Sequence, residues 1–214
     1  MNEMIINDAL EFVKKIFCND YSGHDYFHTL RVYKMAARIA EQENADLMTV
    51  QLAALLHDVD DIKLSPETYA NKDKAVGFMR KHGISEAKIK TICDIIGEVS
   101  FKGTDSAVPE TTEGKCVQDA DRLDAMGAIG IARAFAYGGN HDRILYDPEI
   151  KPSLHMNAGQ YQSHVSTTIN HFYEKLFQLK DLMNTDTAKK IAQQREAYMK
   201  AYISEFLDEW DGIR

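Results

Sequence analysis

Apolar side chains recur at intervals of three and four residues along most of this 214-residue chain. That spacing places them on one face of a helix, whereas a half-buried strand alternates with a period of two. Only four prolines interrupt the pattern. The sequence therefore predicts an all-α protein, and only a short hairpin within an irregular loop would escape this pattern.

The first half of the chain predicts helices separated by polar breaks. Two are expected over about residues 3–17 and 25–43. Asp46 is suited to cap a third helix, LMTVQLAALLHDV, which ends at a His-Asp pair. Ser65-Pro66-Glu67 is typical of a helix start with proline at the first position. Gly83-Ile84-Ser85 indicates a stop followed by a new cap.

The second half predicts three longer helices and two irregular stretches. One helix is expected from about Cys116 to Gly138-Gly139, a pair that favours termination. Irregular structure is expected over 101–114 and 139–156, which are rich in Gly, Pro and polar residues. Two closing helices are predicted over about 160–180 and 186–209, and a Thr or Asp can cap the second.

Composition and charge narrow the class of protein. Apolar residues make up 44% of the chain, which is ordinary for a globular protein, and we expect one domain over residues 1–214. The formal net charge is -8, so no global basic field favours nucleic acid, and we expect no bulk nucleic-acid binding. A local site can still bind one small anionic substrate, because net charge does not decide the chemistry of a cleft.

Cysteine usage and the absence of targeting signals favour a cytoplasmic address. Cys18, Cys93 and Cys116 are an odd number at wide spacings, so they predict reduced thiols and no disulfide framework. The N-terminal stretch carries acids among its apolar residues and lacks a signal-peptide pattern. No apolar run reaches membrane-spanning length, and we expect no membrane partner.

Three segments concentrate the candidate chemistry. GHDYFHTLRV carries His24 and His28, which share one face if the segment is helical. HDVDDIK at 57–63 sets an imidazole beside a carboxylate, and both can reach one ion near an irregular helix end. QDADRLDAMGAIG places three carboxylates in a small, apolar stretch: Asp119, Asp121 and Asp124.

Each segment alone is equally typical of surface histidines and solvated acids. The dipeptide His-Asp occurs three times, at 24–25, 57–58 and 141–142. The pair at 57–58 differs because an apolar helix carries it toward the interior, where it needs a partner. A divalent cation would be that partner, and it would also polarise a phosphoryl group and acidify a water. Together the segments predict one metal site.

The order of the motifs resembles the HD-domain superfamily of metal-dependent phosphohydrolases. A His precedes ThrLeuArgVal, and LeuLeuHisAspValAsp and AlaAspArgLeuAspAla follow. This motif core spans about 24–131, and INHFYEKLFQL with MNTDTAKKIA is similar to small stand-alone bacterial HD proteins. The resemblance implies an irregular helical bundle of the HD type, completed by closing helices over about 160–209.

The resemblance also implies a ligand set: His28, His57, Asp58 and Asp121. His28 immediately precedes ThrLeuArgVal, and the pair after it gives the family its name. Asp119 competes with Asp121, and we prefer Asp121 because the family pattern places this ligand directly after the small residue.

One ion is expected, because family members with more than one metal use additional histidines between the HD pair and the last aspartate. This chain offers only His82 there, within a polar stretch. The resemblance favours Mn²⁺, and the ligand types also suit Mg²⁺, Fe²⁺, Ni²⁺, Co²⁺ or Zn²⁺.

Further residues are expected to act on the substrate or the attacking water. Asp58 or Asp61 can orient the water or take its proton, and Lys63 and Arg122 can neutralise charge that develops on the phosphoryl group. Lys63 and Arg122 are alternatively surface cations paired with nearby acids. The expected substrate-binding set is His24, Arg31, Lys63 and Arg122.

The resemblance further implies a small phosphorylated substrate, a nucleotide. We expect hydrolysis of a nucleoside or deoxynucleoside triphosphate to monophosphate and pyrophosphate. Nucleoside monophosphates and cyclic nucleotides are the rival substrates. The alternative of a different class is an HD module that binds a nucleotide without catalysis. Homodimer formation is left open by the sequence.

Overall fold

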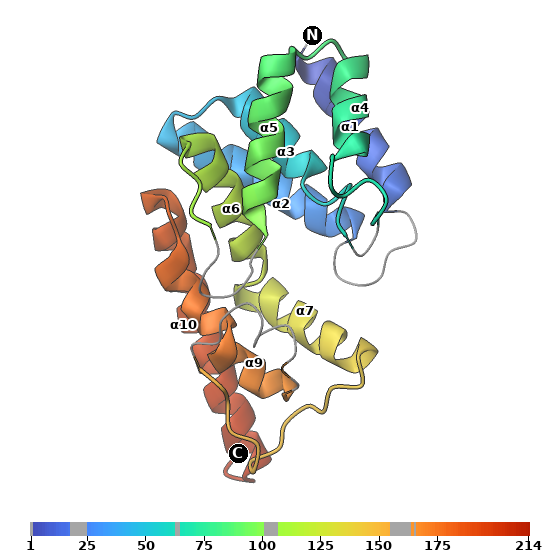
Figure 1. Cartoon of the computed structure of the whole chain (residues 1–214). Coiled ribbons are helices and arrows are strands. Elements are labelled where there is room, and N and C mark those ends of the chain that lie inside the picture. The colour runs from blue at the N-terminus through green and yellow to red at the C-terminus, as the bar shows by residue number, and fades with distance from the viewer. Residues whose placement is uncertain (1, 18–24, 63–64, 101–106, 155–163, 165) are drawn as a thin grey trace. The chain divides into compact units, whose positions relative to one another are not determined.

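The computed structural model describes residues 2–17, 25–62, 65–100, 107–154, 164 and 166–214. Within these residues all regular secondary structure is helical, which confirms the predicted all-α class (Figure 1). The chain divides into two compact units. The first contains the described residues up to Ser100 together with Ala107–Asp121, and the second contains Arg122–Arg214. The expectation of one domain stays a prediction.

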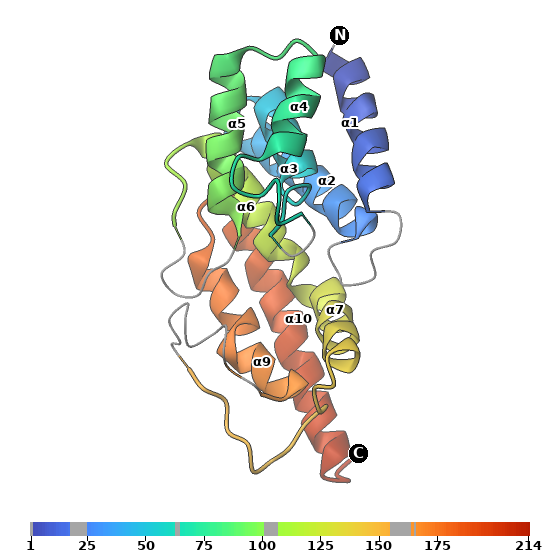
Figure 2. The ribbon, with the colours of Figure 1, turned by 45° about the vertical axis from the view of Figure 1, so that its right-hand side comes forward.

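The first unit is built around one buried helix. Its elements are α1 (Asn2–Ile16), α2 (Tyr26–Glu43), α3 (Leu47–Leu56), α4 (Asp73–Lys81), α5 (Glu86–Val99) and most of α6 (Thr112–Asp124). Helix α3 packs against α1, α2 and α5, as Figures 1 and 2 show. Its Leu52, Leu55 and Leu56 are fully buried. The apolar run therefore forms the core of this unit and carries the residue that follows it inward.

Local caps begin α3 and α5 where the sequence predicts them. The side chain of Asp46 accepts a hydrogen bond from the backbone N of Thr49, at 2.7 Å. Ser85 caps α5 by accepting from the backbone N of Lys88. Gly83 has a φ of 70°, as expected for the stop after α4. These boundaries depend on neighbouring residues alone, which is why the sequence predicts them well.

The helix start predicted at Ser65-Pro66-Glu67 is wrong. Residues 66–72 form turns, and α4 begins only at Asp73. Lys72 has a φ of 54°, in the left-handed region, so a helix cannot run through it. The sequence signal for a helix start was present, but the backbone at Lys72 prevents helix propagation.

Among the described residues, the second unit contains α7 (Gly127–Asn140), α9 (Thr168–Glu174), the 3-10 helix η1 (Leu176–Leu182) and α10 (Asp186–Trp210). Helix α10 packs against α7 and η1, and α9 packs against α7 and η1 (Figure 2). Aromatic rings fill the space between them, with Phe135 lying 6.1 Å from Phe172 and 6.0 Å from Tyr202 between ring centroids. Thr185 caps α10, which confirms the second closing helix.

The single helix predicted from about Cys116 to Gly139 is also wrong, because α6 ends at Asp124 and α7 begins at Gly127. Gly127 has a φ of 71°, which only glycine adopts without strain. The guanidinium of Arg195 on α10 donates to the carbonyl of Leu123, so the opened end of α6 is satisfied by a distant helix. Helical periodicity cannot reveal such a break.

The first closing helix is likewise shorter than the predicted 160–180. Residues 155–163 and 165 lie outside the described residues, and α9 begins at Thr168 after the cap Thr167. It ends at Lys175, where φ is -139° and ψ is -58°. The side-chain amide of Gln178 donates to the carbonyl of Glu174 at 2.9 Å, which stabilises this end.

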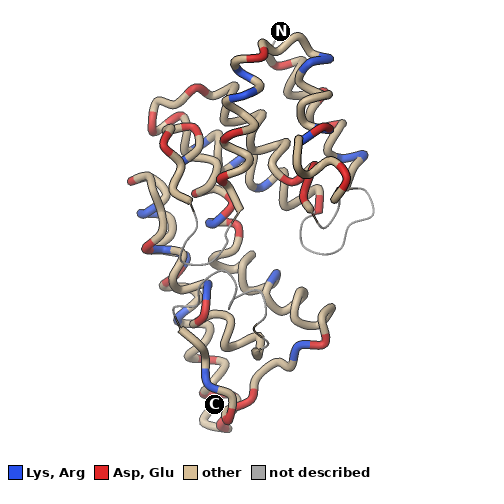
Figure 3. The backbone as a smooth tube through the Cα atoms, in the orientation of Figure 1, with Lys and Arg blue, Asp and Glu red and all other residues tan. Residues whose placement is uncertain are grey.

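Charged residues are spread over the described part of the chain. Lys and Arg as well as Asp and Glu occur in both units, whereas α3 carries no charged residue (Figure 3). No helix of the described residues is both long and apolar enough to cross a membrane. Cys93 and Cys116 are free thiols, and Cys18 lies outside the described residues. The cytoplasmic location and the homodimer stay predictions.

Candidate metal centre

His28 is placed by the first turn of α2. Asp25 is the N-cap of this helix, and its Oδ1 accepts a hydrogen bond from the backbone N of His28 at 2.7 Å. An N-cap carboxylate satisfies one of the amides that a helix leaves open at its start. The imidazole of His28 is fully buried. The cap therefore fixes the backbone that carries a buried histidine.

His57 and Asp58 follow the last turn of α3. His57 is the C-cap residue, and its Nδ1 lies 2.8 Å from the carbonyl oxygen of Ala54. A carbonyl only accepts, so Nδ1 must carry the proton, and Nε2 is left to face the neighbouring acids. The irregular end of the helix lets adjacent side chains face the same point, as the sequence required.

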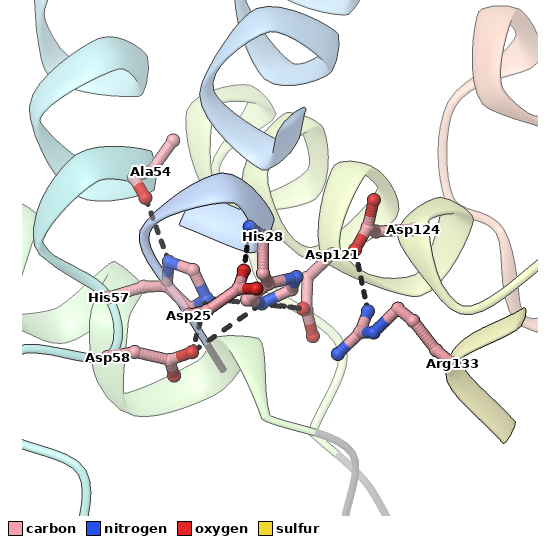
Figure 4. A network of polar contacts seen from close by, with 8 residues as sticks. All are labelled: Asp25, His28, Ala54, His57, Asp58, Asp121, Asp124 and Arg133. Carbon is pink, nitrogen blue, oxygen red and sulfur yellow. Dashed lines mark hydrogen bonds and ion pairs between the residues drawn. The ribbon is translucent and has the colours of Figure 1, made fainter. Parts of the chain in front are cut away.

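The structure brings the four predicted ligands together (Figure 4). His57 Nε2 lies 3.1 Å from Asp58 Oδ2, and His28 Nε2 lies 3.5 Å from the same oxygen. Asp121 Oδ1 lies 3.4 Å from His28 Nε2 and 4.0 Å from His57 Nε2. Three segments far apart in sequence thus direct two imidazoles and two carboxylates at one another.

The electrostatics of this cluster favour a cation. Burial opposes a charged imidazole, yet the carboxylates of Asp58 and Asp121 raise the pKa of His57 to about 9. The proton that His57 holds is thus stabilised by acids that would equally attract a metal ion. Asp121 is the most accessible member, with 22% of its side chain exposed, against 6% for Asp58. A ligand can therefore reach the cluster past Asp121.

The donor atoms fit a divalent ion. At metal–ligand distances of about 2.1 Å, neighbouring ligands of an octahedral ion lie about 3 Å apart. The ligand atoms of His28, His57 and Asp58 all lie within 4.8 Å of one another. Among the described residues, Nε2 of His57 is buried without a hydrogen bond of good geometry. Such an atom needs a partner, and a cation at this point would supply it.

Comparison with known proteins identifies the family. The model of the HD domain matches residues 25–126, a range that contains the whole cluster. The Bacillus subtilis protein YpgQ is 37% identical over 204 residues, which cover 94% of this chain and 92% of YpgQ. The chain belongs to the HD domain family.

Two solved structures support this assignment. An HD-superfamily hydrolase from Bacillus thuringiensis has a TM-score of 0.79 and 42% identity, over 99% of both chains. Bacillus subtilis YpgQ in complex with ADP has a TM-score of 0.75 and 35% identity, over 100% of both chains. This HD protein is therefore a metal-dependent hydrolase.

Asp121 and Asp119 differ in where the HD fold directs them. They are two residues apart on α6, so their side chains leave the helix about 200° apart. Asp121 approaches the histidines, whereas Asp119 is fully buried. This geometry favours Asp121 as the fourth ligand, and the assignment itself stays a prediction.

The other predicted residues of the HD site lie in different surroundings. Arg31 is half-buried on α2, three residues after His28, and Asp61 is half-buried after the HD pair. The guanidinium of Arg122 is buried and donates to the carbonyl of Leu182, so Arg122 is not the surface cation of the alternative interpretation. Its substrate role stays a prediction. His24 and Lys63 lie outside the described residues.

Two contributors escaped the sequence reasoning. Asp25 is not among the residues that the motifs single out, although an acid three residues before His28 is an N-cap signal. Arg133 on α7 donates to Asp124 at 2.6 Å, so it neutralises one of the three acids that had been grouped together (Figure 4). No sequence signal pairs Arg133 with Asp124, because they belong to different helices.

Proposed function

We propose that this protein is a phosphohydrolase acting on nucleotides, with one divalent ion held by His28, His57, Asp58 and Asp121. The observation that carries the proposal is the convergence of two buried imidazoles and a buried carboxylate within 4.8 Å. Mn²⁺ is the first choice, and Mg²⁺, Fe²⁺, Ni²⁺, Co²⁺ and Zn²⁺ are alternatives for a mixed nitrogen and oxygen donor set.

An ion bound there supplies a Lewis acid for a phosphoryl oxygen and lowers the pKa of water. The chain supplies the proton acceptor, for which Asp58 and Asp61 are the candidates. The backbone N of Asp61 donates to the carbonyl of Asp58 at 3.0 Å, so both acids belong to one turn. Asp61 is not in the ligand set, and we propose that its carboxylate takes the proton. His24, Arg31, Lys63 and Arg122 are the proposed substrate contacts.

The nucleotide class is supported by the YpgQ structure with ADP, which aligns with the whole of this chain at 35% identity. Within that class we propose a nucleoside or deoxynucleoside triphosphate, cleaved to monophosphate and pyrophosphate. Nucleoside monophosphates and cyclic nucleotides remain the rival substrates. A module that binds nucleotide without hydrolysing it is the rival function.

The test is release of phosphate and pyrophosphate from a panel of nucleotides. Metal-stripped protein is resupplied with each of the six ions, and wild type is compared with His57→Ala and Asp121→Ala. We expect pyrophosphate release with Mn²⁺ and a loss of at least about 100-fold in both variants, because each removes a ligand. Asp119→Ala is the matched control, since it removes the neighbouring acid of the same helix.

The outcomes separate the candidates. Phosphate release from monophosphates alone would replace the triphosphate substrate. Nucleotide binding without product for any ion would favour the binding module. An inactive Asp119→Ala beside an active Asp121→Ala would exchange the two aspartates in the ligand set.

A further inference from the structure

The turn that carries His57 and Asp58 is tied to α4 by a buried acid, Asp60. Its Oδ1 accepts from the backbone N of Lys74 at 3.2 Å, and its Oδ2 accepts from the backbone N of Ala75 at 3.0 Å. Only 4% of Asp60 is exposed. Both oxygens therefore accept from amides of α4, so this acid, two residues after Asp58, contacts α4.

Helix α4 depends on this contact because it lacks a cap of its own. Lys72 occupies the N-cap position with a φ of 54° and makes no side-chain capping hydrogen bond. The first amides of a helix need an acceptor, and the positive end of the helix dipole favours an anion there. Asp60 lies 14 residues before Lys74 in the sequence, and it supplies both the acceptor and the negative charge.

A second link fixes the same turn. Ser65 Oγ donates to the carbonyl of Val59 at 3.3 Å, and Lys74 Nζ donates to Ser65 Oγ. The backbone N of Ser65 also donates to the carbonyl of Asp61, at 2.7 Å. Ser65 is almost fully buried. We call Asp60, Ser65 and Lys74 the α4 clamp, because together they hold the backbone that follows Asp58 in the sequence.

We propose that Asp60 is a positioning residue for the metal centre, acting through the α4 clamp. The inference rests on the proposed function, since it presumes that Asp58 and His57 bind an ion. Ligands keep their affinity only when neighbouring contacts hold them within about 0.5 Å of the binding geometry. The α3 end fixes His57, and the clamp fixes the turn after it. Asp58 stands between them and keeps its 3.1 Å approach to His57.

The experiment measures Mn²⁺ affinity by calorimetry on metal-stripped protein, with circular dichroism as the measure of folding. We expect Asp60→Ala to weaken Mn²⁺ binding about 10- to 100-fold while helical content is retained. Ser65→Ala should weaken it in the same direction. Asp60→Asn should fall between, because an amide keeps one acceptor oxygen. At saturating Mn²⁺, kcat of Asp60→Asn should approach the wild-type value.

The matched control is Asp46→Ala, which also removes a capping carboxylate. Asp46 caps the N-terminal end of α3, whereas the turn with His57 and Asp58 lies at its C-terminal end. It should lower Tm and leave the Mn²⁺ affinity within about twofold of wild type, since the α4 clamp is intact. A purely structural role for Asp60 would give the same result as this control.

Two results would overturn the inference. If Asp60→Asn and Ser65→Ala lose thermal stability but bind Mn²⁺ as tightly as wild type, Asp60 is a helix cap alone, and the proposed function stands. If wild type itself binds none of the six ions, the proposed function fails first and takes this inference with it. An unfolded Asp60→Ala protein leaves the decision to the other two variants.

Discussion

Asp25 links a helix cap to a proposed metal ligand, His28, within four residues. We expect Asp25→Ala to lower the free energy of unfolding by about 0.5–2 kcal/mol, because the amide of His28 loses its acceptor. The Mn²⁺ affinity should fall as well, since that amide belongs to a proposed ligand. Urea unfolding and calorimetry measure the two effects.

Asp25→Ser provides the control, because serine is an equally good N-cap. It should restore both the stability and the affinity. Loss of affinity in Asp25→Ser with wild-type stability would mean that the carboxylate acts on the site directly and not through the cap.

At the residue scale the sequence predicted which candidate ligands lie close together better than it predicted their surroundings. His28, His57 and Asp58 were identified from motif order, and the structure brings them within 4.8 Å. The environment of Arg122 was not predictable, because its partner is a carbonyl of residue 182. The role of Asp60 was missed for the same reason, since its partners belong to another helix.

At the scale of elements, Gly127 and Gly77 are expected to respond in opposite ways to an added Cβ atom. Gly127 has a φ of 71°, and an added Cβ would meet Arg195 Cγ at 3.0 Å. Gly77 lies within α4 with nothing within 4 Å of an added Cβ. We expect Gly127→Ala to destabilise by at least about 1 kcal/mol and Gly77→Ala to stabilise by about 0.5–1 kcal/mol.

Urea unfolding of both variants measures these changes. The two substitutions are the same in chemistry, so each is the control for the other. Equal effects of the two would contradict the left-handed break between α6 and α7.

Elements bounded by local caps were predicted well, and elements bounded by distant contacts were not. Helices α2, α3 and α10 begin after Asp25, Asp46 and Thr185, whose side chains accept from amides three residues onward. The break after α6 instead depends on Arg195 of α10. Periodicity continues through such a break, because the apolar face persists in the helix that follows.

At the scale of the whole molecule, His171 makes the folded state sensitive to acid. Burial, with smaller contributions from Lys175 and Arg143, lowers the pKa of His171 to about 3. The unfolded chain binds this proton near the ordinary value of 6.5, so the unfolded state gains protons that the folded state refuses. Stability from this group is therefore complete above about pH 6.5 and is lost as the pH falls toward about 3.

We expect the unfolding free energy of wild type to fall faster between pH 6.5 and 4 than that of His171→Gln, by up to about 1.4 kcal/mol per pH unit. Urea titrations across that range measure the two slopes. Parallel slopes would contradict this, because they would show that the pKa of His171 is the same in the folded and the unfolded protein.

The sequence by itself determined the helical class, the buried α3 and the identity of the motifs, because periodicity, composition and capping are local properties. Tertiary structure alone decided where α6 breaks, what caps α4 and which acids face the histidines. Each of those outcomes depends on a group that is distant in sequence: Arg195 for Leu123, Asp60 for Ala75, and Asp121 for His28. Such contacts form only once the chain has folded, because each polar group then takes the partner that folding places within reach.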